Sequence, residues 1–77
     1  MVNLLELKKE IKISGITVVA LSRMTKIPRT TLYSKLRGER EFTCGEAFLL
    51  ASALHFDVDK TIYIFFYDPV PKMEAER

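Results

Sequence analysis

The stretch Pro-Arg-Thr-Thr-Leu-Tyr-Ser-Lys-Leu-Arg-Gly, residues 28–38, predicts a short helix with two unlike faces. Leu32 and Leu36 lie four positions apart, which places both side chains on one face of a helix. Pro28 suits the start of a helix because it has no amide proton to leave unpaired, and Gly38 suits the position just past the end. The helix is therefore expected between these two residues.

The other face of this predicted helix carries cations, hydroxyl groups and one aromatic ring. Its side chains are those of Arg29, Thr30, Tyr33, Ser34 and Arg37. Guanidinium and hydroxyl groups are donors that proteins present to phosphates and to base edges in the major groove. This composition favours the hypothesis of a DNA recognition helix.

Length and composition indicate one small domain with a packed core, because 48% of the 77 residues are hydrophobic. A chain this short buries only about 60% of its unfolded surface, so a dimer interface would add stability. The one cysteine, Cys44, excludes an internal disulfide framework and fits a reducing compartment. No apolar run approaches the roughly 20 residues of a membrane span, and no signal-peptide pattern is present, so we expect a cytoplasmic protein.

The charges are unevenly distributed along the chain. Up to Gly45 there are nine Lys and Arg residues and four acidic ones, whereas from Glu46 onward there are three basic residues and six acidic ones. A basic first half and an acidic second half are expected if one end of the molecule meets a polyanion. An ordinary mixed surface would explain the same counts.

Further helices are expected before and after the opening segment. Asn3 is a suitable cap for a helix over residues 4–13, and Thr17 for one over residues 18–25. Thr43 and Glu46 form a capping box that opens a fourth helix, which ends near His55. The apolar positions expected to face inward are Leu4, Leu7, Ile11, Val18, Leu21, Met24, Thr25, Ala47, Leu50, Ala51 and Leu54.

Residues 59–67, Asp-Lys-Thr-Ile-Tyr-Ile-Phe-Phe-Tyr, are ambiguous. Their β-branched and aromatic content favours a strand. Their periodicity instead favours a helix with Asp57 or Asp59 as its cap and with an inward face made by Val58, Ile62, Phe65 and Phe66. We predict a helix because a single strand would have no partner within the chain. A strand that pairs with its own copy across a dimer is the alternative.

The aromatic side chains of this last segment cannot all be buried by so small a domain. An exposed apolar patch usually marks an interaction surface. We therefore predict a homodimer interface made by Ile62, Tyr63, Phe65, Phe66 and Tyr67. Residues 1–67 are expected to form the domain, and residues 68–77, which are Pro-rich and then charged, a flexible tail.

Several short motifs match a known family in their order and spacing. They are Gly15-Ile16-Thr17, Ile27, Thr31-Leu32-Tyr33, Leu36, Gly38-Glu39-Arg40-Glu41-Phe42-Thr43, Glu46 and Ile64-Phe65-Phe66. In these positions the chain resembles the Cro/repressor-type helix-turn-helix regulators of phages and their bacterial relatives. The resemblance implies an all-α bundle of five short helices that binds operator DNA as a dimer and regulates transcription.

On this hypothesis the recognition helix lies in the major groove. The side chains expected nearest the base edges are Arg29, Thr30, Tyr33 and Ser34. Those expected to contact phosphates are Lys35, Arg37 and Arg40, joined by Lys26 and Arg23. A two-fold dimer reading half-sites about 34 Å apart would supply the specificity that one helix lacks.

Three residues depart from the family pattern. Val18 stands where relatives usually carry a Gln that contacts a phosphate, Lys26 where the turn usually has Gly, and Pro28 in place of a Ser cap. With the apolar C-terminal segment, these changes support an alternative function. The chain would then be a protein-binding helix-turn-helix module, antirepressor or antitoxin-like, that sequesters another regulator.

Catalysis is not expected. The chain has one His and one Cys, no Ser-His-Asp or paired-carboxylate arrangement, and no Gly-rich phosphate loop. A zinc site is not expected for the same reason. We therefore predict that the protein is not an enzyme and needs no cofactor or metal.

Overall fold

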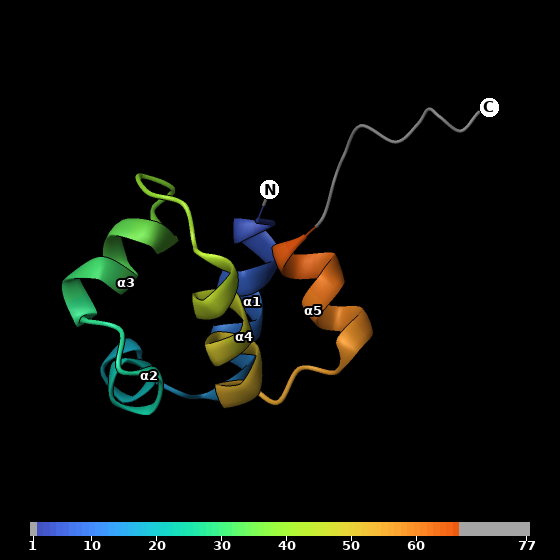
Figure 1. Ribbon diagram of the computed structural model, residues 1–77. Coiled ribbons are helices and arrows are strands. Elements are labelled where there is room, and N and C mark those ends of the chain that lie inside the picture. Colours follow the sequence, from blue (N-terminus) through green and yellow to red (C-terminus); the bar gives the residue numbers. More distant parts are fainter. Residues whose placement is uncertain (1, 67–77) are drawn as a thin grey trace.

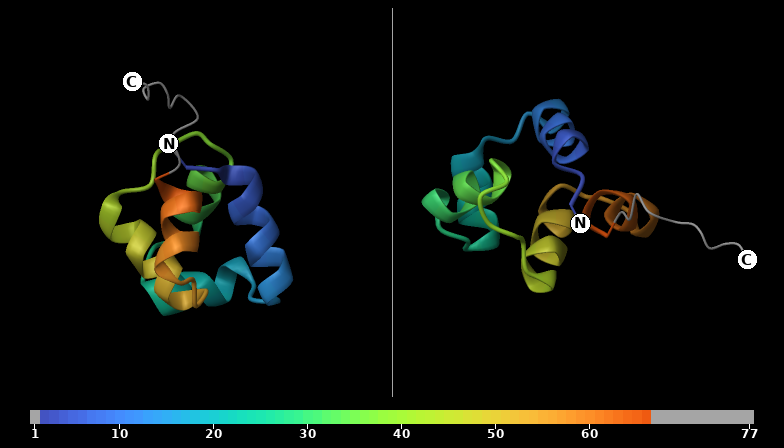
Figure 2. Two further views of the ribbon diagram at one scale, coloured as in Figure 1. Left: turned by 90° about the vertical axis from the view of Figure 1, so that its right-hand side faces the viewer. Right: turned by 90° about the horizontal axis from the view of Figure 1, so that it is seen from above.

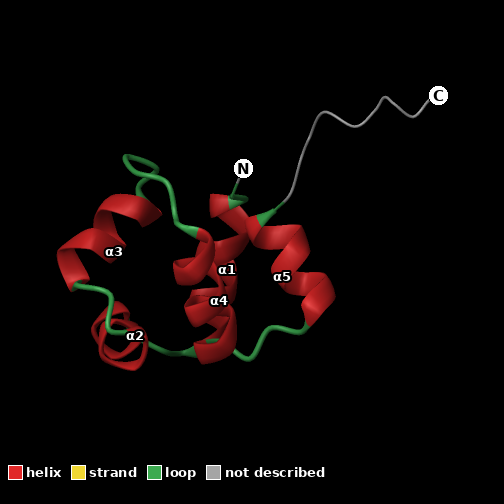
Figure 3. Ribbon diagram, viewed as in Figure 1, coloured by secondary structure: helices red, strands yellow, loops and turns green. Residues whose placement is uncertain are grey.

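Five helices follow one another in the computed structural model, which describes residues 2–66. They are α1 (Leu4–Ser14), α2 (Val18–Thr25), α3 (Arg29–Leu36), α4 (Cys44–Ala53) and α5 (Val58–Phe65), as Figures 1 and 3 show. No strand occurs within the described residues, so the prediction of an all-helical domain is confirmed. The strand alternative for the last segment is wrong as far as Phe66. The predicted tail, residues 68–77, and Tyr67 lie outside the described residues.

Side-chain caps determine where four of the five helices begin. In each, the side-chain oxygen of the capping residue accepts a hydrogen bond of 2.7–3.2 Å from the amide three positions later. The four caps are Asn3, Thr17, Thr43 and Asp57. α3 has no such cap because Pro28 precedes it. The sequence signals for helix starts are therefore confirmed by the hydrogen bonds.

The core forms where α4 packs against α2 and α5. α2 also packs on α3, and α1 lies beside α5 in the left view of Figure 2. Each helix contributes one large side chain that is fully buried: Leu7, Leu21, Leu32, Leu50 and Ile64. Burial of such a side chain stabilises the fold by roughly 1.5–3 kcal/mol, so all five helices depend on one another.

The inward face of α5 differs from the predicted one. Val58, Ile62 and Phe66 were expected inside, but their exposed fractions are 72%, 53% and 44%. The buried residues are Thr61, Ile64 and Phe65, which have the i, i+3, i+4 spacing of one helix face. Met24 of α2, also expected inside, is 51% exposed. These predictions were wrong because the apolar residues of both segments extend around more of the helix than a neighbour covers.

The connection between α2 and α3 consists of Lys26, Ile27 and Pro28. Lys26 has a φ of 63°, in the left-handed region, which costs a non-glycine residue about 1 kcal/mol. Three contacts hold the turn nevertheless: Ile27 is buried, its carbonyl accepts a 2.7 Å bond from the Ser22 hydroxyl, and its amide donates to Thr25 Oγ1. The turn is thus fixed although a non-glycine residue occupies its left-handed position.

Gly38 reverses the chain after α3. Its φ of 83° lies in the left-handed region, and the Glu39 amide then donates back to the Ser34 carbonyl at 3.0 Å. A side chain at Gly38 would meet Leu4 Cδ1 at 3.2 Å. The positive φ favours glycine here, whereas the Leu4 methyl would have to move only a few tenths of an ångström to admit a Cβ. The reversal returns Glu39 to the end of α3.

Candidate functional site

The outward face of α3 carries most of the residues proposed from sequence to contact DNA. α3 lies at the edge of the molecule, on the other side of α4 from α5 (Figures 1 and 2). Arg29 and Thr30 are exposed, Tyr33 is 43% exposed, and Ser34 is half-buried. The structure therefore leaves these side chains accessible on one helix face.

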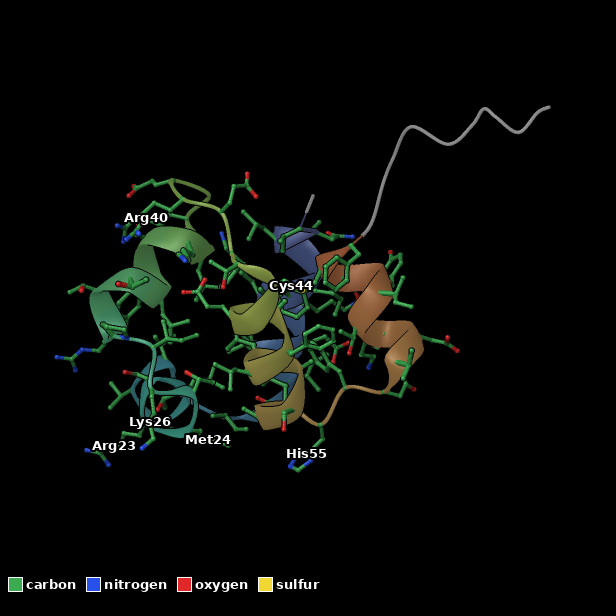
Figure 4. All side chains as sticks on the ribbon, in the orientation of Figure 1. Arg23, Met24, Lys26, Arg40, Cys44 and His55 are labelled. Carbon is green, nitrogen blue, oxygen red and sulfur yellow. The ribbon has the colours of Figure 1, made fainter. Side chains whose placement is uncertain are left out.

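Four cations surround this face without acidic partners. Arg23, Lys26, Arg29 and Arg40 are exposed, and none of them forms an ion pair with any described residue. Figure 4 places Arg23 and Lys26 together at the end of α2, and Arg40 in the loop beyond the other end of α3. Unneutralised charge along one edge attracts polyanions at long range.

Arg37 is exposed but differs from these four. Its Nε donates to Glu39 Oε2 at 2.9 Å and its Nη2 to Glu39 Oε1 at 3.1 Å. The hydroxyl of Ser34 also donates to Glu39 Oε1, at 3.5 Å. Glu39 thus occupies donors that the sequence assigned to phosphate and bases.

The prediction that Lys35 contacts phosphate was wrong. Lys35 is only 4% exposed, and its Nζ is paired with Glu46 Oε1. Lys35 lies three positions after Leu32 and next to Leu36, on the buried face of α3. It therefore joins α3 to the start of α4 and is not available to a ligand.

Glu46 also holds the capping box of α4, because Oε1 accepts the Thr43 amide at 2.8 Å. Burial of the carboxylate opposes its ionisation, but the hydrogen bonds from Lys35 and from the Thr43 amide outweigh that effect. Together they lower the pKa of Glu46 below its ordinary value. The Glu46 carboxylate is therefore ionised near neutral pH.

The predicted dimer residues divide into two groups. Ile62, Tyr63 and Phe66 are 53%, 49% and 44% exposed. Phe65 is buried at 3%, where the ring of Phe42 packs edge-on against it with centroids 5.8 Å apart. Phe65 therefore belongs to the core, and its assignment to the interface was wrong. Tyr67 lies outside the described residues.

An apolar groove of about 390 Å³ runs between α4 and α5. Phe48, Phe56, Val58, Ile62 and Phe66 line most of it. The ring centroids of Phe48 and Phe66 lie 6.2 Å apart, and Phe48 is 57% exposed. The sequence prediction did not include Phe48, although its place next to Ala47 already put it off the buried face of α4.

Other kinds of site are not found among residues 2–66. No group of His, Cys, Asp or Glu side chains there could hold a metal ion. None of the described helices has the length and apolar content needed to cross a membrane.

Comparison with family models, with curated proteins and with solved structures gave no match to this chain.

Proposed function

We propose that this protein binds double-stranded DNA sequence-specifically, as a small Cro/repressor-like transcriptional regulator in which α2 and α3 form a helix-turn-helix. The observation that carries the proposal is the set of four exposed, unpaired cations around the polar face of α3. The three-residue connection between two eight-residue helices supports it.

Docking would place α3 in the major groove. An α-helix with its side chains is about 10–12 Å across, which matches the roughly 12 Å width of that groove. Arg29 can bond a guanine through two donors, Thr30 can bond a base edge or meet a thymine methyl, and Tyr33 can reach a base or a phosphate. Arg23, Lys26 and Arg40 are then the phosphate contacts that carry the salt-sensitive part of the affinity.

The test is a titration of labelled duplexes, selected from a random pool, at several salt concentrations. We expect Arg29→Ala to weaken binding about tenfold, since a good bidentate contact to a base is worth about 1–3 kcal/mol. The matched control is Lys12→Ala, which removes one exposed, unpaired cation from α1. Equal losses for the two variants, or a wild-type affinity that does not change with salt, would contradict the proposal.

We infer that the protein acts as a homodimer through α5. Ile62, Tyr63 and Phe66 expose apolar surface on the side of α4 opposite to α3. Pairing through that surface would leave both recognition helices uncovered. Occupation of an operator by such a dimer would then block polymerase or a competing regulator.

Ile62→Asp is expected to weaken self-association about tenfold or more, because it would bury an unpaired carboxylate in an apolar contact, which costs more than about 1.4 kcal/mol. Sedimentation equilibrium measures the effect. Ile13→Asp is the control, since Ile13 is an equally apolar residue that is 68% exposed on a different helix, α1. A wild-type monomer at high micromolar concentration would refute the dimer.

The second candidate function is the protein-binding module, and the groove between α4 and α5 favours it. Its lining is almost entirely apolar and open to solvent, as expected for a surface that binds another protein. Capture of a regulator from a lysate with and without nuclease separates the two functions. A partner that is retained after nuclease and lost with Ile62→Asp would favour this alternative.

A further inference from the structure

Three donors converge on one carboxylate at the end of α3. Arg37 Nε and Nη2 lie 2.9 and 3.1 Å from the two oxygens of Glu39, and Ser34 Oγ lies 3.5 Å from Oε1. The Arg37 and Glu39 side chains are 57% and 58% exposed. The cluster is therefore open to exchange with an anion from solvent.

The backbone determines this arrangement. The left-handed conformation of Gly38 returns the chain, and the Glu39 amide is bonded to the Ser34 carbonyl at 3.0 Å. This bond places residue 39 beside the last turn of α3, within reach of both Ser34 and Arg37. The carboxylate is thus held over the polar face of the helix by the turn that ends it.

A guanidinium that offers two parallel N–H groups, with a hydroxyl beside it, is suited to phosphate as much as to carboxylate. The hydrogen bonds and the charge of Glu39 raise the pKa of Arg37, and the reverse interaction lowers the pKa of Glu39. Both groups are therefore charged at neutral pH. In the free protein, the positive charge of Arg37 is neutralised by its own neighbour.

We propose that Arg37 and Ser34 form a phosphate-binding site that Glu39 occupies in the free protein, so that a phosphate binds there only by displacing the Glu39 carboxylate. Where the phosphate belongs to a DNA backbone, the inference rests on the proposed function. Glu39 then acts as an internal competitor that lowers the affinity of the α3 surface. Removal of the Glu39 carboxylate is therefore expected to strengthen phosphate binding, whereas removal of a cation from this surface weakens it.

The expected result is that Glu39→Gln tightens binding to a mixed-sequence duplex about fivefold at low salt, because it removes the carboxylate that competes with phosphate for Arg37 and Ser34. Glu41→Gln is the matched control. It removes the same charge from the same loop, and Glu41 is exposed with no ion-pair partner among residues 2–66. Equal gains for the two variants would reduce the effect to net charge and overturn the inference.

A double-mutant cycle tests the displacement itself. In the wild type, Arg37→Ala is expected to weaken duplex binding no more than Lys12→Ala does, because Glu39 already occupies the Arg37 donors and only the change in net charge remains. In the Glu39→Gln background the same substitution should remove the whole gain and reduce the salt slope by about 1. Equal effects of Arg37→Ala in both backgrounds would show that Glu39 does not compete.

A second probe, inorganic phosphate, does not depend on DNA binding. We expect millimolar phosphate to shift the NMR signal of the Arg37 Nε–H group in Glu39→Gln at least about fivefold more effectively than in the wild type or in Glu41→Gln, the same ratio as for the duplex. If this response occurs while no duplex binds, the phosphate site stands and the DNA function fails. If duplexes bind and neither variant responds to phosphate or changes affinity, the DNA function stands and the inference fails.

Discussion

Lys35→Met is expected to lower the free energy of unfolding by about 2 kcal/mol, because it leaves a largely buried carboxylate without its cation. Glu46 keeps only 19% of its side chain exposed, and Lys35 keeps 4%. Methionine retains the apolar length of the lysine stem, so the loss measures the ion pair rather than a cavity. Urea unfolding followed by circular dichroism gives the difference.

The double variant Lys35→Met with Glu46→Gln is the control. The amide oxygen of the introduced glutamine can still accept the Thr43 amide, and no unpaired charge remains, so part of the loss should be recovered. Because the pKa of Glu46 is lowered in the folded protein, the stability from this pair is present above the ordinary value of 4.5 and is lost as pH falls through the lower folded value. Lys35→Met should reduce this pH dependence, because only the hydrogen bonds from Thr43 then favour the ionised carboxylate. An unchanged pH profile, or additive effects in the double variant, would contradict the role of the pair.

Leu32→Ala is expected to have the larger effect, a loss of about 3 kcal/mol in the free energy of unfolding, the usual cost of removing a fully buried leucine. Leu32 has no exposed surface, and it anchors α3 on the core. In a domain this small, such a loss is a large fraction of the total stability. Thermal unfolding should show a markedly lower midpoint, with α3 the helix directly affected.

Leu5→Ala is the matched control for that experiment, since Leu5 is 80% exposed on α1. Its replacement should change stability by less than about 0.5 kcal/mol. If Leu32→Ala were as mild as Leu5→Ala, the packing of α3 against the core would be wrong. The polar face of α3 would then lose its support as a rigid recognition surface.

The helix starts could be read from the sequence because they depend on contacts three residues apart. Asn3, Thr17 and Thr43 cap the helices that their positions predicted, and Asp57 caps α5. The helical state of residues 58–65 was also predictable from the absence of a partner strand. The caps are local features, so the order of residues is enough to determine them.

Whether an individual side chain is exposed or buried was harder to predict. Lys35 and Phe65 were both assigned to binding surfaces, and both are buried. The spacing along each helix indicated burial. Lys35 shares a helix face with Leu32 and Leu36, and Phe65 shares one with Thr61 and Ile64. Residue type was given more weight than position on the helix, although a cation can be buried wherever a partner such as Glu46 faces it.

Local signals in the chain specify five helices and a cationic segment between Arg23 and Arg40, because caps, glycines and periodicity act over a few residues. Which of those cations remain free depends instead on how the helices pack. Lys35 meets Glu46, eleven positions away, once α3 and α4 come together. Arg37 is neutralised by Glu39 once the turn at Gly38 closes. A charge interacts with whatever the fold brings near it, so the candidate surface follows from packing as much as from composition.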